Sequence, residues 1–192
     1  MLRGYLRYFA ALALALAAIT SPAPASERAS EEAAWAALKS GGIVLFRHAN
    51  APGTYDPPGM RLDDCATQRN LDETGRAQAR RIGEAFRARG IPVGKVLTSR
   101  WCRAKETAEL AFPGRAQPEP AFDSLHADRS RGPAQAEAAR RILLAWDGPG
   151  ALVVATHQFT IMAIVDRPSA SGEGIVLRRD GDKLVVVGSV RP

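Results

Sequence analysis

Three short apolar segments, each followed by polar residues, most constrain what this chain can fold into. They lie at residues 43–46 (IVLF), 91–97 (IPVGKVL) and 151–155 (ALVVA). Short apolar runs bounded by glycine or polar residues are typical of strands buried on both faces of a sheet. Because strands that alternate with helices pair in parallel, these segments predict an α/β fold with a largely parallel sheet.

Helical patterns occupy much of the remaining chain. A hairpin is expected near the end, where Asp180-Gly181-Asp182 separates apolar runs at 175–177 and 184–187. Residues 49–70 and 115–132 read as long loops, and loops of this length tend to be functional. We expect helices at residues 31–39, 71–89, 101–112, 133–146 and 159–165.

The first 25 residues resemble a secretory signal peptide. A basic start precedes an apolar stretch at 8–19 and small residues at 23–25. An uncleaved anchor is the alternative, but the apolar stretch is shorter than the roughly 20 residues of a spanning helix. We therefore expect cleavage after Ala25, a periplasmic or secreted protein without a stable membrane anchor, and one domain over residues 26–192.

The charge and the cysteines bear on partners. The formal net charge of +6 suits an anionic substrate, and no basic run interleaved with aromatic residues indicates nucleic-acid binding. Both cysteines, Cys65 and Cys102, would follow the chain into an oxidising compartment, in segments expected to approach one pocket. We expect a Cys65–Cys102 disulfide, and two separate buried thiols are the alternative.

Basic side chains follow each expected strand. Arg47 and His48 follow the first, Arg103 lies in the helix after the second, and His157 follows the third. Parallel strands end at one edge of a sheet, where open α/β folds bind ligands, so these side chains should meet there. Two guanidinium groups and two imidazoles suit a tetrahedral dianion, and one imidazole can attack phosphorus to form a phosphohistidine.

A metal site is another interpretation of the histidines. His48, His126 and His157 could hold zinc with an open position, but they lack a paired ligand spacing, and Arg47 would repel the metal. We therefore expect no metal and no cofactor. His126 does not follow an expected strand, and we interpret it as structural or, alternatively, as a contact to the leaving group. Three further arginines are best interpreted as solvated surface charges, and lining the mouth of the pocket is the alternative. They are Arg61, Arg69 and Arg100.

Four motifs together resemble the histidine phosphatase superfamily, also called phosphoglycerate mutase-like. They are RHA at 47–49, LDETGRAQA at 71–79, SRWCRAKETA at 99–108 and VVATH at 153–157. The motifs occur in the order of that family and cover most of the chain after the signal peptide. The resemblance implies a three-layer α/β/α sandwich with a mostly parallel central sheet.

The resemblance also implies roles for the strand-end residues. His48 would accept the phosphoryl group, which Arg47, Arg103 and His157 would bind, and no cofactor would take part. Exported members of similar layout include bacterial sugar and lipopolysaccharide phosphate phosphatases, which residues 63–65 and 99–103 resemble. A small phosphorylated molecule is therefore the expected substrate.

Two departures from the family pattern matter. Ala49 stands where the family usually has glycine, which is tolerable only if the backbone does not need a positive φ. The family's general acid, a Glu or Asp between the second and third strands, has no unmistakable match. Asp123 is the first candidate, because it follows an apolar residue in that insert, and Asp128 and Glu173 are alternatives. A catalytic acid must lie within hydrogen-bond reach of the leaving oxygen.

The sequence thus predicts an exported, metal-independent phosphomonoesterase that works through a phosphohistidine on His48. A non-catalytic module that binds phosphate or a phosphorylated ligand in a degenerate site is the alternative, motivated by Ala49 and the missing acid. A mutase fits less well, because the chain is short where mutases hold both ends of their substrate. No motif specifies the substrate or the oligomeric state.

Overall fold

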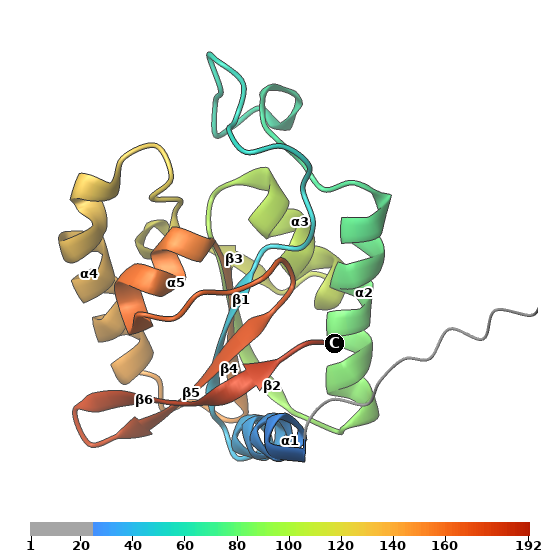
Figure 1. Ribbon diagram of the computed structural model, residues 1–192, viewed down its shortest axis with the longest axis vertical. Helices are drawn as coiled ribbons and strands as arrows, with labels where there is room; N and C mark the ends of the chain where they lie inside the picture. The colour runs from blue at the N-terminus through green and yellow to red at the C-terminus, as the bar shows by residue number, and fades with distance from the viewer. Residues whose placement is uncertain (1–24) are drawn as a thin grey trace, which may run out of the picture.

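A six-stranded sheet forms the centre of the molecule in the computed structural model, which describes residues 25–192 (Figure 1). The predicted signal peptide lies outside these residues except for Ala25, where the first helix begins. The strand order is β3-β2-β4-β1-β5-β6. The strands are β1 (Ile43–Arg47), β2 (Val93–Thr98), β3 (Ala116–Pro118), β4 (Ala151–Thr156), β5 (Gly174–Asp180) and β6 (Lys183–Val190).

Four strands run in parallel and bring their carboxyl ends to one edge. β4 lies between β1 and β2 and pairs in parallel with both, and β3 pairs in parallel with β2. The last residue of β1, Arg47, lies beside Thr156, and Thr98 of β2 lies beside Ala155. β5 and β6 form the predicted hairpin and pair antiparallel. The mostly parallel sheet is confirmed.

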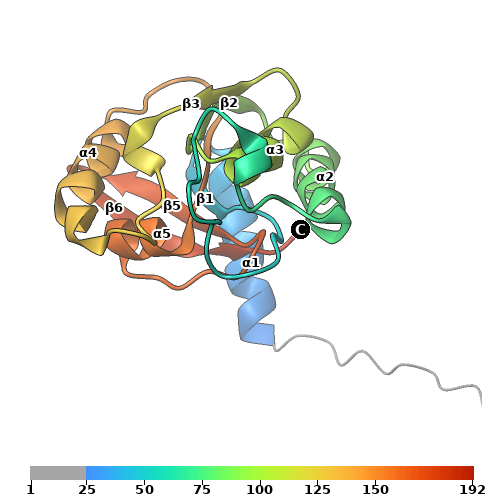
Figure 2. The ribbon, with the colours of Figure 1, turned by 90° about the horizontal axis from the view of Figure 1, so that it is seen from above.

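Helices cover both faces of the sheet. Figures 1 and 2 show α4 and α5 on one side and α2 and α3 on the other. Val44 and Phe46 pack with α1, α2 and α3, while Ile43 and Leu45 pack with α4 and α5. This alternation produces the expected three-layer sandwich. The helices are α1 (Ala25–Lys39), α2 (Glu73–Ala88), α3 (Cys102–Ala111), α4 (Gly132–Leu144) and α5 (Gln158–Val165).

Two elements differ from the sequence prediction. α1 begins six residues earlier than expected, where Glu27 in its first turn favours a helix start through the helix dipole. β3 lies in a segment expected to be a loop; it has only three residues and ends in Pro118, so it gives no strand signal. Within residues 25–192, no helix is both long and apolar enough to cross a bilayer.

The long loop between β1 and α2 rises above the carboxyl edge of the sheet (Figure 1). It contains one short 3₁₀ helix, η1 (Cys65–Thr67), capped by the Asp64 side chain, which accepts a hydrogen bond from the Ala66 amide. A disulfide joins Cys65 of this loop to Cys102 at the start of α3. The predicted pairing of the two cysteines is confirmed.

Candidate active site

His48 lies immediately after β1, at the carboxyl edge of the sheet, and is 3% exposed. Its amide donates to the Thr156 carbonyl of the neighbouring strand at 2.8 Å. Its ring Nδ1 lies 2.8 Å from the carbonyl oxygen of Ala49, an acceptor, so Nδ1 carries the proton of the neutral ring. Nε2 therefore keeps its lone pair and has no hydrogen-bond partner among residues 25–192, which is the state of a nucleophile.

The surroundings of His48 favour the neutral ring. Burial, together with the positive charges of Arg103, Arg69 and Arg47, lowers the pKa of His48 to about 3, although the Ala49 carbonyl acts in the opposite direction. The imidazole is therefore unprotonated throughout the physiological pH range. A nucleophilic histidine needs this state, because a protonated Nε2 has no lone pair to donate.

The start of α2 fixes the chain just after His48. A Cβ on Gly75 would lie only 2.0 Å from the Asn50 carbonyl oxygen, so only glycine permits this approach. Gln78 accepts a hydrogen bond from the Asn50 amide at 3.0 Å and donates to the Ser171 carbonyl at 2.7 Å. These contacts explain why the glycine and glutamine of the LDETGRAQA motif accompany the strand that carries His48.

His157 follows β4 and lies beside His48, with ring centroids 5.4 Å apart. Its Nε2 is 2.8 Å from Ser99 Oγ, which also accepts a hydrogen bond from the Trp101 amide. The Ser99 hydroxyl also lies 3.4 Å from Asp123 Oδ1, to which it can donate. In the tautomer that carries its proton on Nδ1, His157 can donate to an anion beside His48.

Two arginines complete the predicted set. Arg103, in the first turn of α3, is 2% exposed and pairs with Asp56 at 2.7 Å. Arg47, at the end of β1, donates through Nη1 to the Ser169 carbonyl at 3.0 Å. The structure thus brings Arg47, His48, Arg103 and His157 together, as the strand-end motifs predicted.

These four residues line one cavity of about 250 Å³. A larger cavity, of about 620 Å³, lies along α3, beside the disulfide and the strands β2 and β3, and no histidine lines it. Since the expected phosphoryl transfer requires a nucleophilic histidine, we place the site in the smaller cavity. Its other walls come mainly from the loop after β1 and the insert before α4, namely Gly53, Thr54, Arg69, Ser124, His126, Gln158 and Phe159.

The small cavity is surrounded by hydrogen-bond donors without partners. Among residues 25–192, the Nε atoms of Arg47, Arg69 and Arg103 are buried and make no hydrogen bond; His126 Nε2, which donates in one tautomer only, is also buried without a partner. Unpaired buried donors are costly and rare in folded proteins, so their gathering around one cavity indicates a polar ligand. Three guanidinium groups make that ligand an anion.

Mutual repulsion of the arginines supports the same conclusion. Burial and the charge of Arg69 lower the pKa of Arg47. Burial, followed by the charges of Arg69 and Arg47, also lowers the pKa of Arg103, although the Asp56 carboxylate opposes this shift. A bound dianion would relieve the repulsion between these cations.

A match to a family model identifies the chain. The model of the histidine phosphatase superfamily (branch 1) matches residues 43–191, which include all four strand-end residues. The chain belongs to this superfamily. No curated protein matched the chain.

Solved structures agree with the superfamily fold. A phosphoglycerate mutase from Thermus thermophilus is similar at a TM-score of 0.53 and 17% identity, over 76% of this chain and 96% of that one. A mycobacterial glucosyl-3-phosphoglycerate phosphatase has a TM-score of 0.54, 15% identity and coverage of 72% and 92%. The protein histidine phosphatase SixA has a TM-score of 0.54, 13% identity and coverage of 78% and 96%.

Ala49, which departs from the superfamily pattern, fits its position without strain. Among the described residues, Asp166 is the only non-glycine with a positive φ, so the backbone at Ala49 does not need glycine. The Ala49 side chain is fully buried beside Leu71 and Ala79, and its amide donates to Thr107 Oγ1 at 3.0 Å. The alanine is therefore compatible with an intact site.

The predicted general acids lie elsewhere. Asp123 is 1% exposed, accepts two hydrogen bonds from the Arg100 guanidinium at 2.5 and 2.7 Å, and does not line the cavity. Asp128 caps a short 3₁₀ helix, η3 (Arg129–Arg131), and Glu173 pairs with Arg191 at 2.9 Å. The structure brings none of these carboxylates to the cavity wall, and the acid role of Asp123 stays an untested prediction.

The loop between β1 and α2 contributes more to the site than the sequence indicated. Arg69, for which a solvated charge is the preferred interpretation and the mouth of the pocket the alternative, lines the cavity. Asp56, which no motif signalled, holds Arg103 and accepts from Trp101 Nε1 at 3.1 Å. Burial alone would raise the pKa of Asp56, but the Arg103 charge and hydrogen bonds outweigh it and lower this pKa. The carboxylate is therefore a fixed anchor for Arg103.

Proposed function

We propose that the protein is a phosphomonoesterase that forms a phosphohistidine on His48. One observation carries this proposal: a buried, unprotonated His48 Nε2 without a protein partner lines a cavity surrounded by unpaired N–H donors. Two findings support the proposal: the chain belongs to the histidine phosphatase superfamily, and its structural neighbours include phosphatases.

The reaction proceeds in two displacements. Arg47, Arg103 and His157 hold the phosphoryl oxygens while Nε2 of His48 forms a bond to phosphorus and the bond to the alcohol oxygen breaks. The departing alkoxide takes a proton from solvent at the open mouth. Water then attacks phosphorus, releases inorganic phosphate and returns the electron pair to Nε2. Neither step uses a metal.

The mouth of the cavity indicates a small alcohol portion. His126 lies between Tyr55 and Phe159, with ring centroids 4.7 and 5.3 Å away. Flat rings of this kind pack well against the apolar faces of sugars, and the cavity volume of about 250 Å³ limits the substrate to a small monoester. Sugar phosphates, including those of lipopolysaccharide, are therefore the first substrates to test.

We also propose that residues 1–25 direct export. Their basic, apolar and small-residue pattern supports this, as does the Cys65–Cys102 disulfide, a bond that persists in oxidising compartments. Fusion of these residues to a reporter that is active only outside the cytoplasm tests export. An inactive fusion would contradict it.

A phosphate-binding module without turnover is the second candidate. The absence of any carboxylate from the cavity lining, among residues 25–192, favours it. Such a module would gain thermal stability with phosphate or vanadate but would hydrolyse no phosphoester.

Steady-state kinetics separate the two candidates. The wild type should hydrolyse p-nitrophenyl phosphate and at least one sugar phosphate, and His48→Ala should lower kcat/KM by about 10⁴-fold or more, as loss of a nucleophile does. Arg80→Ala, an exposed residue of α2 paired with Glu73, is the matched control and should retain full activity. Undiminished activity of folded His48→Ala would contradict the mechanism.

A further inference from the structure

We propose that Arg69 is a third phosphoryl-binding arginine and that the Cys65–Cys102 disulfide holds it in position. The proposal rests on the function proposed above for the cavity around His48. It assigns a task to a loop residue that no superfamily motif in this sequence marks. It also gives the disulfide a role in the site beyond closing a loop.

The surroundings of Arg69 suit a ligand-binding cation. Its side chain is partly buried and lines the cavity together with His48 and Arg103. Its Nε is buried without a hydrogen-bond partner, and no described carboxylate lies within ion-pair distance of its guanidinium group. Burial lowers the pKa of Arg69, and the charge of Asp56 only partly offsets this effect. The unpaired charge is therefore left for an anion.

Arg61 provides a contrast within the same loop. It is well exposed, and its guanidinium group forms an ion pair with Asp64, three residues away. Arg61 does not line the cavity around His48. Two arginines of one loop thus have different surroundings, and only Arg69 is turned into the site with its charge uncompensated.

Arg69 and Arg103 share an anchor. Asp56 Oδ1 accepts hydrogen bonds from the Arg69 amide at 3.0 Å and from Arg103 Nη1 at 2.7 Å. The guanidinium group of Arg69 donates to the Ala51 carbonyl, which fixes its direction. The two cations are therefore held near each other despite their repulsion, as a site for a divalent anion requires.

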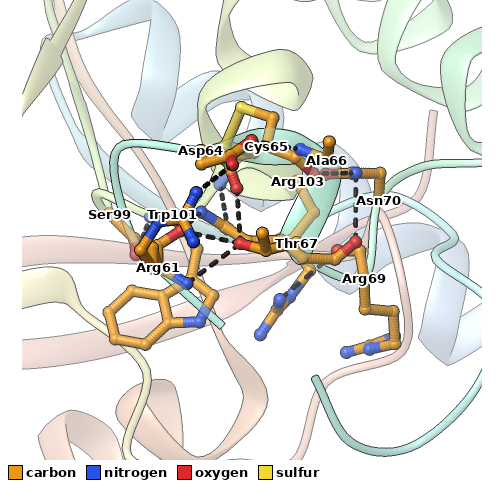
Figure 3. The surroundings of a disulfide bond; sticks show 12 residues. Arg61, Asp64, Cys65, Ala66, Thr67, Arg69, Asn70, Ser99, Trp101 and Arg103 are labelled. Carbon is orange, nitrogen blue, oxygen red and sulfur yellow. Dashed lines mark hydrogen bonds and ion pairs between the residues drawn. A yellow bond between two sulfur atoms is a disulfide. The ribbon is translucent and has the colours of Figure 1, made fainter. Parts of the chain in front are cut away.

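The disulfide joins the two backbone segments that carry these arginines. Cys65 lies four residues before Arg69, and Cys102 lies directly before Arg103. Figure 3 shows both arginine side chains extending away from the disulfide toward the same side. A covalent link at this point restricts the freedom of the loop between β1 and α2, which is otherwise long and irregular.

Two side-chain contacts extend this link toward Arg69. Gln68 accepts a hydrogen bond from the Cys102 amide at 2.9 Å, at the start of α3. Asn70 donates to the Cys65 carbonyl at 2.6 Å. The residues on both sides of Arg69 are thus tied to the disulfide-bonded segment, so a displacement of Cys65 would displace the guanidinium group.

Binding of orthovanadate to the oxidised wild type and its variants tests the role of Arg69 without requiring turnover. Arg69→Ala should weaken vanadate binding by about 10-fold or more, the usual effect of removing a charge-assisted hydrogen bond, and Arg69→Lys should restore part of the loss. Arg61→Ala is the matched control and should bind as the wild type does. Unchanged vanadate affinity in folded Arg69→Ala would overturn the proposal.

A double-mutant cycle tests the role of the disulfide. Replacing both cysteines by serine should weaken vanadate binding several-fold when Arg69 is present and by less than about twofold in the Arg69→Ala background, because coupled residues are non-additive. Additive losses would overturn the positioning role. So would unfolding of the cysteine-free protein at the assay temperature, since the bond would then stabilise the whole fold.

The same samples distinguish this inference from the proposed function. Vanadate binding that depends on Arg69, in a protein that hydrolyses no phosphoester, would leave the inference standing and refute the phosphatase. Hydrolysis that depends on His48 but is unaffected by Arg69→Ala would do the reverse. Reduction of the folded wild type with dithiothreitol should reproduce the serine variant's loss of affinity when inorganic phosphate, which thiols do not reduce, replaces vanadate as the ligand. Unchanged phosphate affinity after complete reduction would overturn the disulfide's role.

Discussion

The floor and the mouth of the cavity are built in different ways. On the floor, Arg47 ends β1, and His48 and His157 directly follow β1 and β4, two adjacent parallel strands buried in the middle of the sheet. Arg103, in the first turn of α3, completes the floor. At the mouth, Tyr55, His126 and other residues come from long loops, and Tyr55 is 73% exposed. The comparison suggests that the sheet fixes the chemistry, while the loops determine which substrate reaches it.

After the loss of His48 itself, the largest effect should follow from removing a cation of the floor. Arg103→Ala should lower kcat/KM about 10³-fold, because it removes charge stabilisation where charge develops on the phosphoryl oxygens. Steady-state kinetics measure this, with Arg80→Ala as the control. A loss of kcat/KM below about tenfold would contradict the distinction between floor and mouth, since a floor residue would then contribute no more to catalysis than a residue of the mouth.

The pH dependence of stability should also report on the floor. Unfolded His48 binds a proton near pH 6.5, whereas folded His48 does so only near pH 3, so acidification between these values favours unfolding. The stability contributed by neutral His48 is complete above pH 6.5. It should fall by about 2.5 kcal/mol between pH 7 and pH 4.5.

Urea unfolding at both pH values measures this change. His48→Asn removes the titrating group, so the variant should lose about 2.5 kcal/mol less than the wild type over the same interval. Equal losses in the two proteins would show that His48 titrates normally. A floor with an ordinary histidine would no longer contrast with the solvent-accessible mouth.

A substitution at Asp123 should have an effect smaller than the change at the floor and larger than the changes at the mouth. Asp123→Asn weakens the contacts with Arg100 and should lower the free energy of unfolding by about 1–3 kcal/mol. Because its carboxylate does not line the cavity, kcat should change by the same factor for p-nitrophenyl phosphate and for an alkyl phosphate. A loss confined to the alkyl phosphate, whose leaving group needs a proton, would instead support the general acid predicted from sequence.

The smallest effects should arise at the mouth. Tyr55→Ala and Phe159→Ala should each raise KM by about three- to tenfold with kcat nearly unchanged, because they remove about 1 kcal/mol of stacking that does not change in the transition state. The rise should differ between a sugar phosphate and phosphate esters without a ring. A large loss of kcat would show that the mouth takes part in the chemistry.

The fold and the floor could be predicted because both follow from local sequence patterns. Apolar runs mark the buried strands, and the geometry of parallel strands brings their ends together, so Arg47, His48 and His157 could be placed without knowing any loop. Arg103 could be placed in the same way, because its helix directly follows the second buried strand. The superfamily resemblance added the roles of these residues.

The mouth could be predicted only as one of several alternatives, because contacts between distant parts of the chain determine it. Arg69 reaches the cavity only because Asp56, Gln68 and the disulfide fix its loop. The place of Asp123 in the insert predicts a general acid, but its carboxylate binds Arg100 and does not line the cavity. Neither arrangement leaves a periodic signal in the sequence.

Trapping the phosphorylated enzyme tests the central claim most directly. The protein would be mixed with a phosphoester labelled at phosphorus and quenched, and the account predicts a covalent label that is acid-labile, alkali-stable and located on His48. His48→Ala should carry none. Full turnover in a protein that accumulates no label under rapid quenching, or a label on any residue other than His48, would contradict the account.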